Sequence, residues 1–597
     1  MYKKKMIEAI QFFNLGQKNI AFQIMQKLEE EHPNELNIKY NYALMLGMDG
    51  MYLEEQKKYK EIIAINPMDS DTYVNLAISL NETKDYKESI QCSNQALKIN
   101  PNIAEGYEAR GIAKQHLDLI EEANLDFRKW LKLELKEEHS KYSKILMECL
   151  ELIKLPAIYQ NEKELNNNRK TLEKRAKDAL EKLKKTPIEC IEKNNVGTKI
   201  AFKINRFYLA YHQKNDKKIN EIFCEITKLL LGEQHNFTEQ ENKRENILGV
   251  ISTFRYHPKQ FIIEQLKQLD KNIKTTLIVV NNPQIILGKI PENFYIEHIN
   301  ITPNNIKEAI KKIHDKNIDI LFMPDIGMSI ESQLLATYKL AKVSMMGWLH
   351  PVTSGSKNID YFLSGELMET LDSQNQYTET LIKLPGVGLK IKPEDYISTT
   401  INELQSKNKN EYFKIGCLQT PFKYHPKYDY ILIEIAKKIK KVNFIFIKYN
   451  DELDNKLMNR IKAEFEKNNL DPNIIKLQER LQKETYRNFL KTLDIALDTF
   501  GWSGGNTTLD CLGAGLPVLT MQNEYMRANH TAGIYKLIDE ETLILNSPNE
   551  LIHKIEELNN DAIKLKRMQI KIYEKFIRLE SDSGISNFIN MINLSIR

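Results

Sequence analysis

Apolar and polar residues alternate along the first quarter of the chain with the period of amphipathic helices, and the pattern recurs at intervals of about 34 residues. Pro33, Pro67 and Pro101 mark this interval. Small residues keep the same spacing where two helices must lie close together, at Ala9, Ala43, Ala77 and Gly111. Because two such helices cannot bury their apolar faces alone, the pattern predicts four stacked helical pairs, at residues 2–33, 36–67, 70–101 and 104–135.

The second helix of each pair has a small-residue site of its own, which is filled by Ala21, Ser89 and Ala123. Glu55 breaks the pattern at this site, and Leu135 stands where a fourth proline would be. The unit resembles the tetratricopeptide repeat, and residues 1–138 are identified as a tetratricopeptide domain. The resemblance implies a surface that binds a protein or peptide, and it implies no chemistry.

Residues 139–245 have the pattern of charged helices and are predicted to form a helical linker. The run of charges from 162 to 185 is typical of a solvated helix face. Residues 205–216, NRFYLAYHQKND, are predicted to form a buried helix beneath the next domain.

From residue 246 the pattern changes to short apolar runs that alternate with amphipathic helices. This alternation predicts two parallel sheets, one in residues 246–405 and one in residues 406–597. The predicted strands are NILGVIST, KTTLIVVNN, IDILFMPD, KVSMMGWL and IDYFLSG, then FKIGCLQ, NFIFIKY, NIIKLQE, DIALDTF and LPVLTM. Ligands of such folds bind at the carboxyl ends of the strands, and a cleft between two such domains is the natural site.

Composition and charge indicate which partners and which cellular compartment to expect. The 85 basic and 81 acidic residues leave a net charge of only +4, which argues against a dedicated nucleic-acid surface. The six cysteines are scattered, so we expect reduced thiols. Polar residues interrupt the N-terminal segment, and no uncharged stretch approaches the roughly 20 residues that span a bilayer. We therefore expect a cytoplasmic protein with no membrane segment.

The most informative local motif is the glycine-rich turn in DIALDTFGWSGGNTTLDCLGAG, between a predicted strand and a predicted helix. Gly504 and Gly505 allow a ligand to approach the backbone closely, since neither has a Cβ. Thr507 or Thr508 can cap the helix, whose free N–H groups favour a phosphate or diphosphate. Asp498, at the end of the strand, is predicted to accept hydrogen bonds from a ribose. A tight turn without a ligand is the simpler alternative, and no lysine follows the glycines as in a P-loop.

These residues resemble the nucleotide-diphosphate loop of the O-GlcNAc transferase family and its plant-type SPINDLY relatives. The family joins tetratricopeptide repeats to a GT-B fold, which consists of two Rossmann-like domains with a cleft between them. Further segments agree in family order: STFRYHPKQF, MPDIGMS, GWLHPVTSGSKNIDYFLSG, QTPFKYHPK and ERLQKETYRNFL. Bacterial members with this arrangement are the most similar.

The resemblance assigns roles in the nucleotide half. Lys423 matches the lysine that contacts the diphosphate, where a fixed cation stabilises the leaving group. Lys483 matches a lysine on the nucleoside side, and Asp498 matches the ribose-binding carboxylate. Thr507 and Thr508 match the threonines on the phosphates, and Asn506 belongs to the same loop.

In the first half, the resemblance implies that His257 lies near acceptor and sugar, where it handles or orients a proton. Asp325, His350, Thr353 and Ser354 fall in the loops that face sugar and acceptor. The sequence also departs from the animal enzymes. Asn506 replaces a histidine, Phe489 replaces a base-contacting arginine, and His350 replaces a tyrosine, so the base and the sugar stay open.

Asn41 and Asn75 lie one repeat apart, at the same place in the first helix of successive units. Stacking puts both amides on one concave surface, where each offers donors and an acceptor to a peptide backbone. The family uses a ladder of asparagines at this position, which is short here because Ile7 and Ala109 occupy the outer sites. The alternative is that both asparagines are merely solvated.

Metal dependence is not expected, because the only D-x-D, Asp69-Ser70-Asp71, falls in a turn between repeats and is better explained as turn and cap chemistry. The resemblance thus implies a protein O-glycosyltransferase that transfers a sugar, with UDP-GlcNAc the expected donor, to Ser or Thr. By the same resemblance the reaction inverts the anomeric centre and needs no metal or cofactor. Three alternatives remain: a repeat adaptor with an inactive catalytic half, an enzyme with another donor such as UDP-glucose or GDP-fucose, and a small-molecule enzyme such as a sugar-nucleotide epimerase. The sequence does not indicate the oligomeric state.

Overall fold

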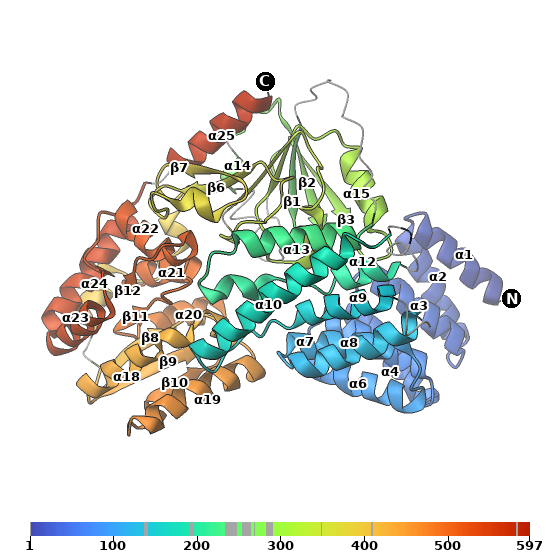
Figure 1. The fold of residues 1–597 in the computed structure, drawn as a ribbon, viewed down its shortest axis with the longest axis horizontal. Coiled ribbons are helices and arrows are strands. Elements are labelled where there is room, and N and C mark those ends of the chain that lie inside the picture. Colours follow the sequence, from blue (N-terminus) through green and yellow to red (C-terminus); the bar gives the residue numbers. More distant parts are fainter. Residues whose placement is uncertain are drawn as a thin grey trace. The chain divides into compact units, whose positions relative to one another are not determined.

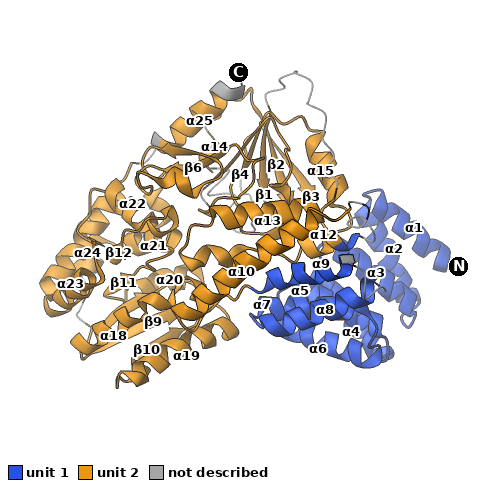
Figure 2. Ribbon diagram, viewed as in Figure 1, with its two compact units in different colours: residues 1–154, 189–196 blue, residues 155–188, 197–597 orange. Residues whose placement is uncertain are grey.

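The computed structural model describes residues 2–135, 141–187, 189, 195–232, 247–253, 264–267, 269–281, 290–347, 349–407, 410–580 and 583–596. The chain divides into two compact units (Figure 2). Unit 1 comprises residues 1–154 and 189–196, and unit 2 comprises residues 155–188 and 197–597.

Unit 1 contains the four predicted helical pairs. They are α1 (Tyr2–Asn14) with α2 (Lys18–Glu31), α3 (Leu36–Met48) with α4 (Tyr52–Ile65), α5 (Ser70–Glu82) with α6 (Tyr86–Ile99), and α7 (Ala104–His116) with α8 (Ile120–Leu135). The small positions are fully buried at Ala9, Ala43 and Ala77. At Gly111 a Cβ would lie 2.7 Å from the Phe127 ring, so the close contact between α7 and α8 requires glycine. The predicted register is confirmed.

Two details of unit 1 follow from its sequence. Asp69 caps α5, because its side chain accepts hydrogen bonds from the backbone N–H groups of Asp71 and Thr72. The D-x-D is therefore cap chemistry, as predicted. α9 (Lys141–Leu150) and a 3-10 turn, η1 (Glu151–Ile153), continue the unit beyond the predicted boundary at residue 138.

Glu55 occupies the small-residue site of α4 and is buried. Its carboxylate lies against Gly47, where a Cβ would be 2.3 Å from Oε1, and it accepts a hydrogen bond of 2.7 Å from the Ser79 hydroxyl. Burial raises the pKa of Glu55 to about 7, and the hydrogen bond from Ser79 opposes the shift.

Unit 2 contains two parallel sheets (Figure 1). The first has the order β3-β2-β1-β4-β5-β6-β7 and the second the order β10-β9-β8-β11-β12-β13. The strands of the first are β1 (Ile247–Ser252), β2 (Lys274–Val280), β3 (Phe294–Ile299), β4 (Ile320–Met323), β5 (Val343–Gly347), β6 (Tyr361–Gly365) and β7 (Thr380–Leu384). Those of the second are β8 (Phe413–Cys417), β9 (Val442–Ile447), β10 (Ile475–Gln478), β11 (Ile495–Leu497), β12 (Val518–Met521) and β13 (Ile544–Leu545).

The sequence pattern predicted all of these strands except β3, β7 and β13, and these three all lie at sheet edges. Edge strands are less fully covered, so they lack the continuous apolar run of a central parallel strand. The helices of the first half are α14 (Glu264–Leu266), α15 (Ile306–His314), α16 (Ile330–Leu335) and α17 (Ile401–Ser406). Those of the second are α18 (Asp429–Lys438), α19 (Asp451–Lys467), α20 (Lys483–Leu490), α21 (Asn506–Gly513), α22 (His530–Leu537), α23 (Pro548–Asn560) and α24 (Ala562–Ile577).

The last helix, α25 (Ser583–Ile596), returns to the first sheet, where Phe588 packs 5.3 Å from Phe322 between ring centroids (Figure 1). The helical segment before the sheets contributes α10 (Glu162–Leu183) and α13 (Lys217–Leu230) to unit 2, together with α12 (Val196–Ala201) apart from its first residue. The predicted buried helix at 205–216 is instead a 3-10 helix, η3 (Phe207–His212), which ends where Gln213 adopts a left-handed φ of 53°.

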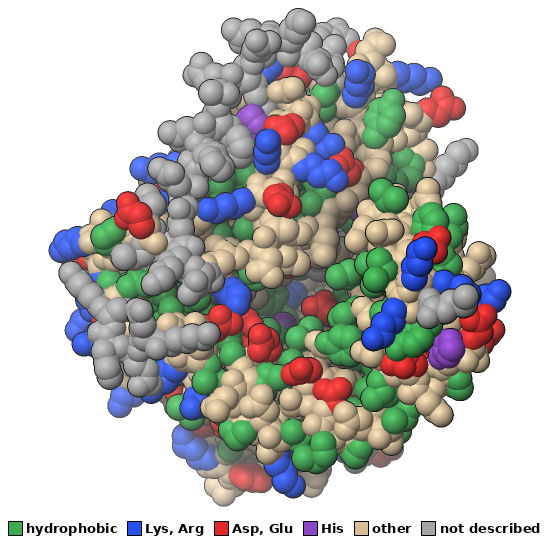
Figure 3. All heavy atoms as spheres, turned by 90° about the vertical axis from the view of Figure 1, so that its right-hand side faces the viewer, with side chains coloured by type: hydrophobic (Ala, Val, Ile, Leu, Met, Phe, Trp, Pro, Cys, Tyr) green, Lys and Arg blue, Asp and Glu red, His purple; other side chains and the backbone are tan. Residues whose placement is uncertain are grey.

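Basic and acidic side chains of the described residues are interspersed on the face that Figure 3 shows. None of the described helices is both long and apolar enough to cross a membrane.

Candidate active site

The candidate site lies where the second sheet reverses its strand order. β8 and β11 are neighbours, but β8 continues to β9 on one side and β11 to β12 on the other. The loops that leave the carboxyl ends of β8 and β11 therefore border a crevice, the usual ligand site of such sheets. Lys423 follows β8, in the 3-10 turn η7 (Pro421–Lys423), and the glycine-rich turn follows β11.

Asp498 holds the glycine-rich turn in shape. Its Oδ1 accepts from the N–H groups of Thr499 (2.9 Å) and Gly504 (2.8 Å). Its Oδ2 accepts from the hydroxyls of Ser503 (2.5 Å) and Thr520 (2.8 Å). The residue is 3% exposed. Both oxygens are thus used inside the protein, and a ribose hydroxyl would have to replace one of these donors; the ribose contact stays a prediction.

Gly504 and Gly505 have different roles in the turn. At Gly504 a Cβ would lie 2.6 Å from Nε2 of Gln419 and 2.8 Å from Oγ1 of Thr508, so only glycine lets the turn pack here. At Gly505 a Cβ would meet no atom of the described residues within 4 Å. The backbone at Gly505 is therefore the part of the turn that a ligand can approach.

The predicted threonine cap of α21 is wrong. The N-cap is Gly505, and no side chain of the described part of the chain caps the helix. Thr508 is buried and donates to the carbonyl of Gly504 (2.9 Å), while Thr507 lies partly exposed in the first turn. Oδ1 of Asn506 accepts from the Tyr396 hydroxyl (3.2 Å). An N-terminus without a side-chain cap keeps N–H groups and positive dipole for an anion.

Lys423 is brought against this turn. Its Nζ donates to Oε1 of Gln419 (2.8 Å), and Gln419 packs on Gly504. Burial lowers the pKa of Lys423 to about 8, and the charge of Asp498 opposes the shift. The side chain is therefore still largely charged at neutral pH, and a diphosphate anion would offset the free-energy cost of burying this charge.

Arg527 and His530 also belong to this region. Arg527 is only 4% exposed and forms an ion pair of 3.5 Å with Asp216. His530 begins α22, and the N–H of Thr531 donates to Oγ of Ser503 in the glycine turn (2.9 Å). Both residues follow β12, which the sheet order places beside β11.

Lys483 lies exposed at the start of α20. The charge of Lys483 acts to lower the pKa of Asp510. Asp510 forms an ion pair of 3.4 Å with Arg487, and its side chain is 20% exposed. Burial raises the pKa of Asp510, and Arg487 and Lys483 oppose the shift. Sequence reasoning missed Arg487 and Asp510. Asp510 is a partly exposed carboxylate in the same helix as the turn threonines, unlike the enclosed Asp498.

The first sheet has its own reversal point, between β1 and β4. Asp325 follows β4 and is completely buried. Its Oδ2 accepts from the N–H (2.7 Å) and the hydroxyl (3.0 Å) of Thr253, which follows β1. Asp325 therefore joins the two loops at the carboxyl edge of this sheet.

Thr353 and Ser354 are bound to a buried carboxylate. The Thr353 hydroxyl donates to Glu379 (2.7 Å), and both the N–H (2.8 Å) and the hydroxyl of Ser354 donate to its other oxygen. Burial raises the pKa of Glu379, and these donors oppose the shift. In the structure both hydroxyls fix the loop, and contact with sugar or acceptor stays a prediction.

His350 is 5% exposed, and its Nδ1 finds no hydrogen-bond partner within the described ranges. Burial lowers its pKa to about 3, with Arg527 and Arg206 adding to the shift, so the imidazole is neutral. Gly327, at a φ of +102°, makes room for the ring, since a Cβ there would lie 2.3 Å from Cδ2 of His350.

An aromatic cluster joins the two halves around η3. Phe207 lies 5.7 Å from His350 and 5.6 Å from Phe422, and Trp502 lies 4.4 Å from Tyr211 and 5.4 Å from His350, between ring centroids. Phe422 precedes Lys423, and Trp502 belongs to the glycine turn. Trp502 thus packs inside the cluster, and η3 fixes the loops of both halves around one site.

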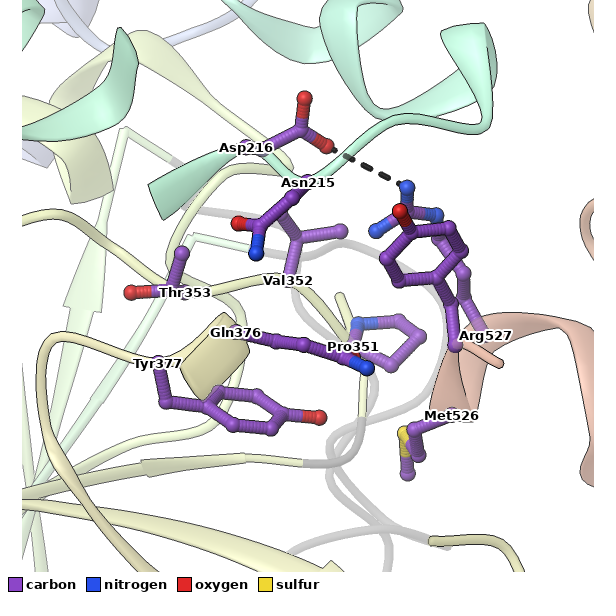
Figure 4. Close-up of a pocket in the computed structure, with 10 residues that line it drawn as sticks. Asn215, Asp216, Pro351, Val352, Thr353, Gln376, Tyr377, Met526 and Arg527 are labelled. Atoms are coloured by element: carbon purple, nitrogen blue, oxygen red, sulfur yellow. Dashed lines mark ion pairs between the residues drawn. The ribbon is translucent and has the colours of Figure 1, made fainter. Parts of the chain in front are cut away.

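Beside this cluster is a pocket to which all three parts of unit 2 contribute (Figure 4). It is lined by Asn215 and Asp216 before α13, by residues 351–353, 376 and 377 of the first half, and by residues 525–527 of the second half. The Asp216–Arg527 ion pair forms one wall. Asp216 also pairs with Arg169 of α10 at 2.7 Å, so the helical segment is tied to the second half.

His257, predicted near acceptor and sugar, lies outside the described residues, as does Trp348. The described residues contain no group of three or more His, Cys, Asp or Glu side chains that could hold a metal ion.

Asn41 and Asn75 occupy the same position in α3 and α5. The Asn75 amide donates to the Tyr40 hydroxyl (2.7 Å), and the Asn41 amide donates to the Asn37 carbonyl (2.8 Å). Both amides are partly exposed. Peptide binding at this position stays a prediction.

No family model matches the chain. Similar sequences include two plant proteins named probable UDP-N-acetylglucosamine–peptide N-acetylglucosaminyltransferase SPINDLY. The protein from Solanum lycopersicum is 22% identical over 229 residues, which are 38% of this chain and 24% of that protein. The protein from Eustoma exaltatum subsp. russellianum is 21% identical over 293 residues, 49% of this chain and 31% of that protein. The match thus spans less than a third of the length of either relative.

A further similar sequence is the TPR repeat-containing thioredoxin TDX of Arabidopsis thaliana, with 28% identity over 112 residues, 19% of this chain and 30% of that protein. Among solved structures, a mutant of the Thermobaculum terrenum O-GlcNAc transferase matches with a TM-score of 0.61 and 15% identity, covering 94% of this chain and 98% of that one. The predicted resemblance and the predicted fold, helical repeats followed by two parallel-sheet domains, are confirmed.

Proposed function

We propose that the chain is a protein O-glycosyltransferase that transfers N-acetylglucosamine from UDP-GlcNAc to Ser or Thr hydroxyls of a protein held by the repeats. One observation carries the proposal. Lys423, the accessible backbone of Gly505 and the N-terminus of α21 converge at the reversal point of the second sheet. This arrangement suits a diphosphate. The names of the plant relatives and the shared fold support a sugar nucleotide as the donor.

In the proposed reaction the acceptor hydroxyl oxygen forms a bond to the anomeric carbon while the bond from that carbon to the β-phosphate oxygen breaks. The bonding pair leaves with the nucleoside diphosphate, and the hydroxyl proton passes to a base. Attack opposite to the leaving group inverts the anomeric centre. His257 remains the predicted residue for proton handling.

The leaving group gains negative charge as its bond breaks, and a fixed cation in a partly buried site stabilises that charge most effectively. Lys423 supplies the cation, and the N–H groups of α21 supply hydrogen bonds. The proposal therefore includes no metal and no further cofactor. Asp510 offers the ribose a more accessible carboxylate than Asp498, because four donors already enclose Asp498.

The repeats would select the acceptor, and a cytoplasmic location belongs to the same proposal. A panel of UDP- and GDP-sugars incubated with the protein and a lysate, followed by intact-mass analysis of modified proteins, tests the function. A mass increase of one N-acetylhexosamine with UDP-GlcNAc supports it. Transfer from GDP-fucose or UDP-glucose instead would correct the donor. If the protein neither hydrolyses nor transfers the sugar of any donor, the repeat-adaptor alternative is supported. If it converts one sugar nucleotide into another, the result indicates an epimerase.

A further inference from the structure

His530 is a candidate for a role that the sequence left unassigned. The glycine turn, GWSGGNTT, contains no histidine and itself contributes no imidazole. His530 comes from a different segment, beyond the next strand of the sheet, at the first position of α22.

Several contacts attach the start of α22 to the glycine turn. The N–H of Thr531 donates to Oγ of Ser503 (2.9 Å), and Oγ1 of Thr531 lies 2.8 Å from Oγ1 of Thr508. Ser503 also donates its N–H to the carbonyl of Arg527 (2.7 Å), just before the helix. His530 therefore has a fixed position relative to Gly504 and the first turn of α21.

Lys423 is attached to the same turn through Gln419. Gln419 accepts from Nζ of Lys423 (2.8 Å) and packs against Gly504. The charge of Lys423 also contributes to lowering the pKa of His530. Nδ1 of His530 is buried and has no hydrogen-bond partner in the part of the chain that the structure describes.

We propose that His530 is a further residue of the diphosphate site and that its imidazole, protonated when the sugar nucleotide binds, donates a hydrogen bond to the diphosphate alongside Lys423. This inference rests on the proposed function. A buried ring nitrogen without a hydrogen-bond partner costs free energy, and an anion removes that cost only when the nitrogen carries a proton to donate. The diphosphate is the anion that this turn suits.

The electrostatics explain how the site would respond to the donor. Burial lowers the pKa of His530 to about 4, Lys423 adds to the shift, and a hydrogen bond to the Ser503 backbone opposes it. His530 is therefore neutral at neutral pH before the donor binds. A diphosphate introduces two negative charges next to the ring and raises its pKa, so the ring takes one proton from solvent. That proton returns to solvent when the nucleoside diphosphate leaves, and the overall reaction is unchanged.

Calorimetry of UDP-GlcNAc binding to the full chain tests this, with UDP-glucose and GDP-fucose as further probes. Measured at pH 6.5 in buffers of different ionisation enthalpy, binding should take up about one proton, because the sugar-linked diphosphate does not titrate there and Lys423, with its pKa of about 8, is already charged. In His530→Asn the proton uptake should disappear and the Kd should rise about tenfold, the value of one charge-assisted hydrogen bond. His553→Asn, whose side chain is 81% exposed on α23, is the matched control and should behave as the wild type.

Donor binding without proton uptake, or uptake that persists in His530→Asn, would overturn the role of His530 and leave the proposed function standing. Failure of every sugar nucleotide to bind the wild type would overturn both. If His530→Asn fails to fold, His530→Gln gives the same test, and circular dichroism confirms which variant is folded.

Discussion

Replacing Lys423 by methionine should separate activity from stability. The structure places its Nζ 2.8 Å from Gln419, next to Gly504, where the proposed diphosphate would lie. Methionine has a similar length and adapts to the shape of a partly buried space, but it carries no charge. The variant therefore removes the cation with little change in packing.

The magnitude follows from the pKa of Lys423. Burial lowers it from 10.5 to about 8, which corresponds to about 3 kcal/mol at about 1.4 kcal/mol per tenfold change in the proton equilibrium. The folded protein tolerates this cost without donor, whereas the leaving diphosphate offsets it in the transition state. Removal of one such electrostatic group typically lowers kcat by two to three orders of magnitude, or about 3 to 4 kcal/mol.

The two effects have opposite signs. In Lys423→Met, hydrolysis of the sugar nucleotide and transfer to protein should both fall by about two to three orders of magnitude. The Tm should stay the same or rise, because a cation that is destabilised by burial has been removed. Lys427→Met, at an exposed position in the turn that follows, is the matched control and should retain both activities.

Turnover and melting temperature measured on the same preparations decide the outcome. Activity within threefold of the wild type would refute the assigned role of Lys423. A variant that loses activity together with a large part of its stability would also refute the reasoning, because it would show that Lys423 supports the fold and that the loss of activity is indirect.

Three further predictions concern other parts of the chain. EDTA should leave the transfer rate unchanged, and a loss that Mn²⁺ or Mg²⁺ restores would show that the diphosphate site needs a metal. Asn41→Ala with Asn75→Ala should weaken transfer to protein acceptors but not hydrolysis; if both activities fall together, the repeats have only a structural role. The pKa of Glu55 in the folded protein is raised from 4.5 to about 7. The protonated carboxyl therefore contributes to stability below pH 4.5, and this contribution is lost as the pH rises through 7. Glu55→Gln should raise the free energy of unfolding by up to about 3 kcal/mol at pH 8 and leave it unchanged at pH 4.5. Thermal melts at both pH values measure this, with exposed Glu54→Gln as the control, and equal Tm shifts at the two pH values would contradict the burial argument.

The sequence by itself determined the parts of this protein that local pattern encodes. Helical pairs recur at a constant interval because each pair must place the same small residues against its neighbours, and Ala9, Ala43 and Ala77 are indeed fully buried. Central strands such as β4 were predicted because a parallel strand covered on both faces is a continuous apolar run. The glycine turn could be located because a strand, two glycines and a helix follow one another directly in the chain.

Only the tertiary structure decided which side chains of that turn face inward and what lies opposite them. Asp498 and Asp510 are both carboxylates near the turn, but four donors from the turn and from β12 enclose Asp498, whereas Asp510 sits partly exposed beside Arg487. The cap of α21 proved to be Gly505, because Thr508 bonds instead to Gly504 and Thr531. Gln419, which accepts from Lys423, and Thr531, which follows His530, both contact the glycine turn although they follow different strands and lie far apart in the sequence. Such proximity depends on the strand order of the sheet and on how three segments pack around one turn, and no local pattern of polar and apolar residues carries that information.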